Sequence, residues 1–177
     1  HFDFDFSGLD KQLRSVFSQV KNRVKDAMQN MDFNVDLERI FGGAKGEAEL
    51  NFTFSSEGIE ALSLANVWGN TVVSGSDEEE IQVKANVGVW SDNEENAKAV
   101  AGSFSLSEER AGSTLVLRSS QLEGRRMQVD YHVFVPRHIA IWLETASGEL
   151  RLENLEGGSA LSTASGDVYL DNLCGTN

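Results

Sequence analysis

The chain has 177 residues, of which 40% are hydrophobic and 24% charged, a composition that suits one folded domain and argues against wholesale disorder. Its formal net charge of -13 argues against nucleic-acid binding, because an acidic surface repels phosphate backbones. The single cysteine, Cys174, excludes an intrachain disulfide and a cysteine-based metal site.

No targeting or membrane-spanning segment is recognisable in the sequence. No apolar run approaches the ~18 residues that a transmembrane helix needs, and the first residues do not form a signal peptide. The chain begins with His1 rather than methionine and ends inside a repeat. We therefore expect it to be a piece of a longer protein that continues beyond its C-terminal repeat.

Residues 1–45 are predicted to form an N-terminal arm and an amphipathic helix. Phenylalanine and aspartate alternate over residues 2–6, as in a short strand or an extended arm. Between Leu9 and Met31 apolar residues recur every three or four positions, which predicts a helix with one apolar stripe. The stripe consists of Leu13, Phe17, Val20, Val24, Ala27 and Met31.

The predicted helix is basic although the chain is acidic. It contains five basic and two acidic residues, a net charge of +3 (5 minus 2), so the remainder of the chain carries -16 (-13 minus 3). Three roles remain open: packing on its own acidic domain, pairing with another helix, or lying on an anionic membrane. Packing on the domain is favoured because opposite charge is available within the chain. The residues expected to face a partner or a membrane are Lys11, Arg14, Lys21 and Lys25.

Residues 46–177 are predicted to form a β domain. Apolar and polar residues alternate at 48–54, 81–89, 115–117 and 127–135, and each stretch indicates a strand with one face buried. The segment from Asp92 to Ala101 predicts a short helix, capped by Ser91 or Asp92 and ended by Gly102.

The most informative feature is a repeat near the C-terminus, in which the pattern of residues 143–158 recurs at residues 161–176. Both copies contain Thr-Ala-Ser-Gly, an acidic residue, two alternating apolar residues and Asn-Leu. A degenerate earlier copy lies at 62–75. A single copy cannot bury its apolar face alone, so stacked copies are expected to share one core.

This stacking predicts structural roles for the repeated glycine and polar residues. Corners between the short strands need positive φ, which glycine supplies, and they are expected at Gly69, Gly148 and Gly166. Equivalent polar side chains should stack as ladders, formed by Thr145, Thr163, Asn154 and Asn172. The last copy leaves an open sheet edge, so self-association through that edge is an expected interaction.

The run from Val129 to Pro136, followed by Ile139, Ile141 and Leu143 and by the two Thr-Ala-Ser-Gly repeats, resembles the bacterial "putative adhesin" domain family over about residues 58–177. The resemblance implies a mainly β fold, a β-solenoid or β-helix-like stack of short strands with repeats of about 18 residues, in a bacterial envelope protein. It implies no catalytic residues. Some members with a helical N-terminal segment look like envelope-stress regulators that respond to antimicrobial peptides.

The sequence shows no recognisable catalytic or metal-binding constellation. His132 and His138 lie six residues apart around Pro136, which is not a helical zinc motif. No nucleophile elbow or phosphate-binding loop occurs. The acidic run from Asp77 to Glu80 is interpreted as a solvated loop. We therefore expect no enzyme activity, no metal and no cofactor.

The sequence favours a non-catalytic binding or scaffolding module of the bacterial cell envelope or cell surface, whose partner is a protein or a cell-surface ligand. The first alternative is an envelope-stress sensor that binds cationic peptides or a membrane-protein partner, with the basic helix as its signalling or membrane element. The alternative location is cytoplasmic and membrane-associated. A remote alternative is a carbohydrate-active enzyme on a β-helix, a fold that hosts many functions.

Overall fold

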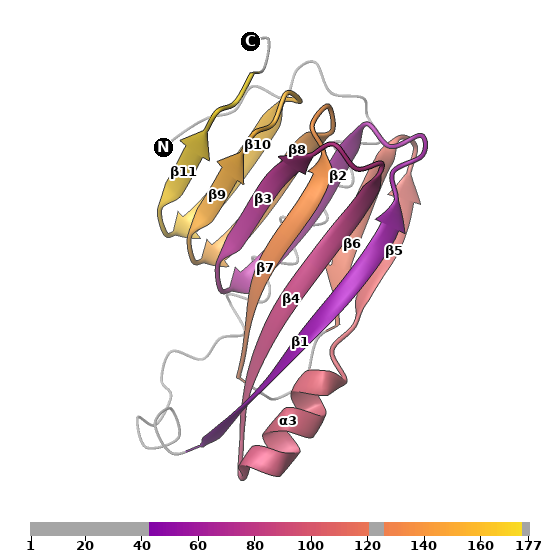
Figure 1. Cartoon of the computed structure of the whole chain (residues 1–177). Coiled ribbons are helices and arrows are strands. Elements are labelled where there is room, and N and C mark those ends of the chain that lie inside the picture. Colours follow the sequence, from indigo (N-terminus) through magenta and orange to yellow (C-terminus); the bar gives the residue numbers. More distant parts are fainter. Residues whose placement is uncertain (1–42, 121–125, 175–177) are drawn as a thin grey trace.

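The computed structural model describes residues 43–120 and 126–174, which form two β-sheets and one short helix (Figure 1). The first sheet, sheet A, has the strand order β1 (Ala44–Ser55), β4 (Glu80–Ser91), β7 (Met127–Pro136), β3 (Thr71–Ser76), β9 (Leu150–Glu153) and β11 (Val168–Asp171). The second, sheet B, has the order β10 (Ser159–Ser165), β8 (Ala140–Ser147), β2 (Ala61–Trp68), β6 (Thr114–Ser119) and β5 (Leu106–Ala111). The mainly β prediction is confirmed.

The core lies between the two sheets and comes from the alternating residues of the predicted strands. In β4, Val83, Ala85 and Val87 are fully buried, because every second side chain of a strand points to the same face. Sheet B contributes Leu62 and Ile141 to the same core cluster. Each fully buried aliphatic side chain contributes about 1.5–3 kcal/mol, so this shared interior holds the two sheets together.

The two C-terminal repeats pair with each other in parallel at the expected offset. Leu161 lies beside Leu143 in sheet B, and Leu170 lies beside Leu152 in sheet A. The degenerate copy joins the same stack, since Val73 also pairs with Leu152. Each copy supplies one strand to sheet B and the next strand to sheet A. Figure 1 shows these three units, β2 with β3, β8 with β9 and β10 with β11, next to one another at one end of the molecule.

The predicted solenoid is nevertheless wrong, because both sheets mix parallel and antiparallel strands. Strands β1, β4 and β7 pair antiparallel in sheet A, and β5 and β6 pair antiparallel in sheet B. Strands β1 and β4 each have 12 residues, which is too long for a repeat unit that must also hold a second strand and two corners. The repeat therefore corresponds to a local stack of short parallel strands at one end of the molecule. The remainder of the two sheets consists mainly of antiparallel strands.

The corner glycines stack on one another at the turns between paired strands. Gly69, Gly148 and Gly166 have φ values of 128°, 138° and 147°. The Gly69 N–H donates to the carbonyl of Ser147, and the Gly148 N–H donates to that of Ser165. Backbone therefore contacts backbone at each corner, where a side chain would interfere.

The ladder residues lie in neighbouring strands or at neighbouring turns. Thr145 pairs with Thr163 in β10 and with Asn66 in β2. Asn172 donates from Nδ2 to Oδ1 of Asn154 at 2.7 Å, and these two asparagines have φ values of 48° and 54°. Asparagine is one of the few residues apart from glycine that adopt this left-handed conformation readily.

The predicted short helix is α3 (Glu94–Gly102), and its cap differs from the prediction. Asn93 is the N-cap, and its side chain accepts a hydrogen bond from the Asn96 N–H at 2.8 Å. The asparagine was overlooked although its side chain is as good an N-cap acceptor as aspartate or serine. The helix packs against β1 and β4 and buries Ala97 and Ala101.

Several sequence predictions lie outside the described residues, including the N-terminal arm, the amphipathic helix and its basic residues Lys11, Arg14, Lys21 and Lys25. Strand β1 already begins at Ala44. Among residues 43–120 and 126–174, no helix is long and apolar enough to cross a bilayer.

Candidate binding face

The outer face of sheet A presents a row of polar and aromatic side chains that crosses neighbouring strands. We call it the mixed face and define it by Lys84, His132, Phe134, Ser74, Arg151, Glu153, Glu149 and Tyr169. On β4, β7, β3 and β9 these residues alternate with buried core residues, so they point to the opposite side of the sheet, and Tyr169 of β11 shares their face through its pairing with Arg151. The register aligns Lys84 with His132, and Arg151 with Tyr169.

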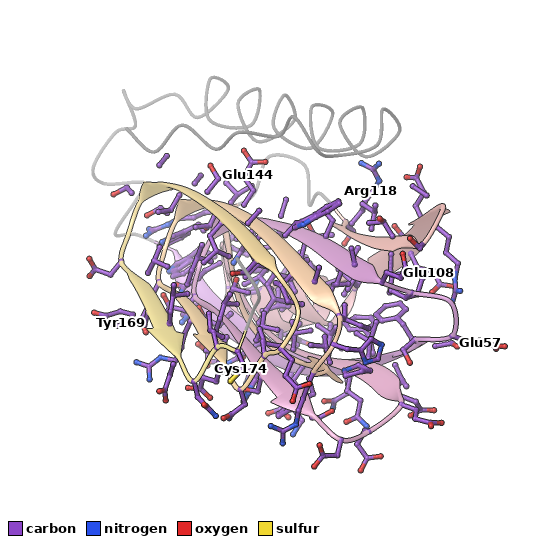
Figure 2. All side chains as sticks on the ribbon, turned by 90° about the horizontal axis from the view of Figure 1, so that it is seen from above. Glu57, Glu108, Arg118, Glu144, Tyr169 and Cys174 are labelled. Atoms are coloured by element: carbon purple, nitrogen blue, oxygen red, sulfur yellow. The ribbon has the colours of Figure 1, made fainter. Side chains whose placement is uncertain are left out.

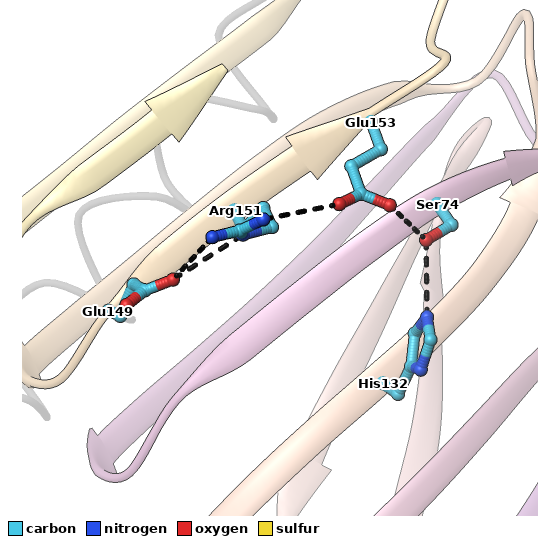
Figure 3. A network of polar contacts seen from close by, with 5 residues as sticks. All are labelled: Ser74, His132, Glu149, Arg151 and Glu153. Carbon is cyan, nitrogen blue, oxygen red and sulfur yellow. Dashed lines mark hydrogen bonds and ion pairs between the residues drawn. The ribbon is translucent and has the colours of Figure 1, made fainter. Parts of the chain in front are cut away.

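A polar network links β7, β3 and β9 on this face (Figure 3). The Ser74 hydroxyl lies 3.1 Å from Nε2 of His132 and donates to Glu153 Oε2 at 3.4 Å. Arg151 pairs with Glu153 Oε1 at 3.7 Å and with Glu149 Oε1 at 3.3 Å. The network therefore joins side chains that come from strands distant in the sequence.

The hydrogen bond from Ser74 to Glu153 competes with a catalytic role for this serine. A serine hydroxyl has one proton, and the carboxylate of Glu153 can only accept. When the hydroxyl proton goes to Glu153, the tautomer of His132 that carries its proton on Nε2 donates to the serine oxygen. A histidine that activates a serine nucleophile has to accept the hydroxyl proton instead. The geometry supports a positioning role for the pair within a surface network.

Aromatic rings and cations alternate along the mixed face. The ring of His132 stacks on Phe134 with centroids 4.2 Å apart. Lys84 Nζ lies 5.6 Å from the Phe134 centroid, and the Arg151 guanidinium lies 5.2 Å from that of Tyr169. Each exposed cation–π contact contributes about 0.5–1 kcal/mol. These contacts hold long side chains in place and reduce the entropy that a partner would otherwise have to remove.

Burial lowers the pKa of His132 below its ordinary value of 6.5. The negative charge of Glu153 partly opposes this lowering, and the positive charge of Lys84 adds to the lowering. Protonation is then easier in the unfolded chain than in the folded one. The contribution of His132 to stability is therefore fully present above pH 6.5 and is lost as the pH falls through the lowered folded pKa.

Replacing the two charged neighbours should move this pKa in opposite directions. We expect Glu153→Gln to lower the pKa of His132 further, because it removes the negative charge that favours the imidazolium. Lys84→Met should raise it by removing a repelling positive charge. NMR titration of the imidazole protons measures both shifts, and Glu149→Gln is the matched control. Shifts in the same direction for both variants would contradict the network.

A second feature is a shallow hollow of 760 Å³ at the end of the sheets where β1 ends and β7 ends. Its lining contains six carboxylates and two basic side chains, which are Glu57, Asp77, Glu78, Glu79, Glu80, Glu156, Arg137 and His138. Arg137 pairs with Asp77 at 2.9 Å, and this pairing raises the pKa of Arg137. The run interpreted as a solvated loop therefore forms one wall of an acidic hollow (hereafter the acidic hollow). Across the described ranges, no three His, Cys, Asp or Glu side chains are placed to hold a metal ion.

Two tryptophans form a third cluster, at the C-terminal ends of β2 and β4. The rings of Trp68 and Trp90 are stacked with centroids 5.4 Å apart. The Arg126 guanidinium lies 4.6 Å and 4.5 Å from them, and Lys45 lies 5.2 Å from Trp90. Both rings are half-buried, so they close this end of the structure as well as offering an aromatic edge.

The structure places the predicted corners and the asparagine ladder at the stacked turns and the threonine ladder within β8 and β10, away from the mixed face. Sequence reasoning missed that face, although one signal for it was present. The alternation at 127–135 assigns His132 and Phe134 to the side opposite Val133. Which strands lie beside them depends on pairings between β7, β3 and β9 that no local pattern records.

No family model matches the chain, and no curated protein matches it. A "putative cell adhesion protein" from Clostridium sporogenes is similar in structure, with 16% identity, a TM-score of 0.47, and coverage of 71% of this chain and 61% of the other. A "putative adhesin" from Parabacteroides merdae shows 5% identity, a TM-score of 0.35, and coverage of 67% and 59%. Another "putative adhesin", from Parabacteroides distasonis, shows 7% identity, a TM-score of 0.35, and coverage of 75% and 67%.

The chain thus spans about three fifths of the length of the first two solved structures. At such low identities and TM-scores, the likeness assigns neither a family nor a function to the chain. Its described part is a two-sheet β structure that resembles proteins called adhesins.

Proposed function

We propose that this protein is a non-catalytic binding or scaffolding module of the bacterial cell envelope, adhesin-like in type, and that it binds a protein partner through the mixed face. The observation that carries the proposal is the ordered row of cations and aromatic rings on an exposed sheet. Arg151, Tyr169 and Phe134 are of the residue types enriched at the centres of protein interfaces.

The chemistry of the mixed face supports binding over catalysis. The Ser74 hydroxyl can give its one proton to Glu153 instead of His132, and the His132 ring is stacked on Phe134, which supports a place for both groups in a surface network. The acidic hollow lies elsewhere and shares no residue with this face. Tyr169 is 45% exposed and can contact a partner without any rearrangement of the fold.

Photo-crosslinking in living bacteria tests this proposal. A photoreactive phenylalanine analogue replaces Tyr169 on the mixed face or, as a matched control, Glu108 on β5 of sheet B. Figure 2 shows these two positions on opposite sides of the molecule. We expect crosslinks to one protein partner from position 169, at least tenfold fewer from position 108, and loss of capture after Arg151→Ala. Equal crosslinking from both positions, or none from 169, would exclude this face.

The acidic hollow favours the second candidate, an envelope sensor that binds cationic peptides. Six carboxylates and only two basic groups line it, so a peptide rich in lysine or arginine would find complementary charge. Titration with an amphipathic cationic peptide should show binding that weakens at least tenfold between low and high salt. Glu78→Gln together with Glu156→Gln should weaken it, and Glu108→Gln should not. Binding that ignores salt and the paired substitution would exclude the sensor.

A further inference from the structure

The outer face of sheet B is buried, although it points away from the core between the sheets. Ser63 pairs with Trp142 on one side and with Val116 on the other, so the three side chains share one face. Their exposed fractions are 2%, 8% and 1%. Ala146, on the same face of β8 as Trp142, is 5% exposed. Strand β8 is thus buried on both faces, which is unusual for a strand in an outer layer.

The described elements do not account for this burial. Helix α3 packs on β1 and β4 of sheet A, and its Ala101 belongs to the core between the sheets. Within residues 43–120 and 126–174, no other helix is present to cover sheet B. Something outside these ranges must exclude water from Trp142, Ser63 and Val116.

We propose that residues 9–31 dock on the outer face of sheet B, with their apolar stripe against Trp142, Val116 and Ala146. The stripe from Leu13 to Met31 would be about 27 Å long as a helix. Five strands in a sheet span about 19–24 Å, so the stripe and the face match in size. The segment between Met31 and Gly43 can extend over about 36 Å, enough to reach sheet B from the start of β1.

The charges on the two surfaces also agree. Glu144 lies on the same face of β8 as Trp142 and is only 9% exposed. A carboxylate this deeply buried is stable only beside cations or hydrogen-bond donors. Residues 9–31 carry a net charge of +3, and Figure 2 shows Glu144 and Arg118 on this same side of the molecule. Arg118 already pairs with Glu109 at 2.8 Å, so it adds little repulsion.

Docking has a functional consequence that is independent of the proposed protein-binding role. With the stripe covered, Lys11, Arg14, Lys21 and Lys25 form a cationic ridge on an otherwise acidic molecule. The apolar stripe could enter a membrane only after it had left sheet B. Docking therefore makes membrane contact of the stripe and burial of the sheet B face mutually exclusive.

Disulfide trapping in the full chain tests the docking. Cys174→Ser removes the native thiol, Ser63→Cys marks the face, and single cysteines replace Leu13, Phe17, Val20 or Val24 of the stripe. Ser15→Cys, about 200° around the helix from Leu13, is the matched control. We expect at least one stripe variant to form an intramolecular disulfide at least tenfold faster than the control. Intermolecular disulfides would assign the face to a second copy, and equal rates would remove the helix from it; either result overturns the proposal.

A second measurement does not depend on cysteine geometry. In a full chain with Trp68→Phe and Trp90→Phe, Trp142 is the only tryptophan left and can be excited selectively over tyrosine. Phe17→Asp with Val24→Asp should release the stripe, shift the emission to the red and raise acrylamide quenching about threefold. Ser15→Asp with Asn22→Asp, which makes the same change in charge about 180–200° away from the stripe, should leave the quenching unchanged. Two results together would overturn the docking: high quenching of Trp142 before any stripe substitution, and binding of the unsubstituted stripe to anionic phosphatidylglycerol vesicles. They would assign the stripe to a membrane.

Discussion

Replacing Gly148 with alanine should lower the free energy of unfolding by at least about 3 kcal/mol, the largest effect we expect from a single methyl group. A Cβ atom at this position would lie 2.0 Å from the carbonyl oxygen of Gly69. The backbone φ of 138° adds strain, because L side chains rarely adopt it. Neither atom can move away without separating the paired strands β3 and β9.

The same loss is expected for Gly166→Ala, whose Cβ would lie 2.0 Å from the carbonyl oxygen of Gly148. Gly158→Ala is the matched control, because a Cβ there would meet no atom within 4 Å. Urea denaturation followed by circular dichroism measures all three variants. A change of less than about 1 kcal/mol for Gly148→Ala, close to that of the control, would show that the corners do not stack as described.

Truncating two equivalent leucines of the repeat should give very different results. Leu152 is fully buried, whereas Leu170, which pairs with it from the equivalent position of the next copy, is 57% exposed. Leu152→Ala should cost about 2–5 kcal/mol, because it removes buried apolar surface and leaves a cavity. Leu170→Ala should cost less than about 0.5 kcal/mol. Denaturant unfolding of both variants at low protein concentration provides the comparison.

The leucine pair also tests the predicted self-association. Val168, Tyr169 and Leu170 are exposed on β11, at the edge of sheet A (Figure 1). If a second chain paired with this edge, Leu170→Ala would become costly and its effect would grow with protein concentration. A loss for Leu170→Ala equal to that for Leu152→Ala in dilute solution would contradict the exposed edge.

The exposed strand and the mixed face meet at Tyr169, which contacts Arg151 and belongs to both. A chain pairing with β11 would therefore lie beside the protein-binding face that we propose. Binding through one surface is expected to affect access to the other. Crosslinking from position 169 in a dimer and in a monomer distinguishes the two interactions.

The sequence by itself determined the elements whose signals are local. Alternating apolar residues predicted the strands that became β1, β4, β6 and β7, and the constant offset of the repeat predicted the pairing of Leu143 with Leu161. These predictions hold because side-chain alternation and a repeated apolar pattern are properties of neighbouring residues. The same reasoning overlooked Asn93 as the N-cap of α3, where several adjacent polar residues are equally able to cap.

Only the tertiary structure decided how the stacked turns join the long strands. The repeat suggested that one pattern of pairing continues through the chain, but β7 pairs in parallel with β3 and antiparallel with β4. Each edge of an alternating strand can pair with a parallel or an antiparallel neighbour. The apolar pattern of the strand is the same in either case, so it does not reveal the direction of the neighbour. The mixed face arises from those choices, because His132 meets Ser74 and Glu153 only through strands that are distant in sequence.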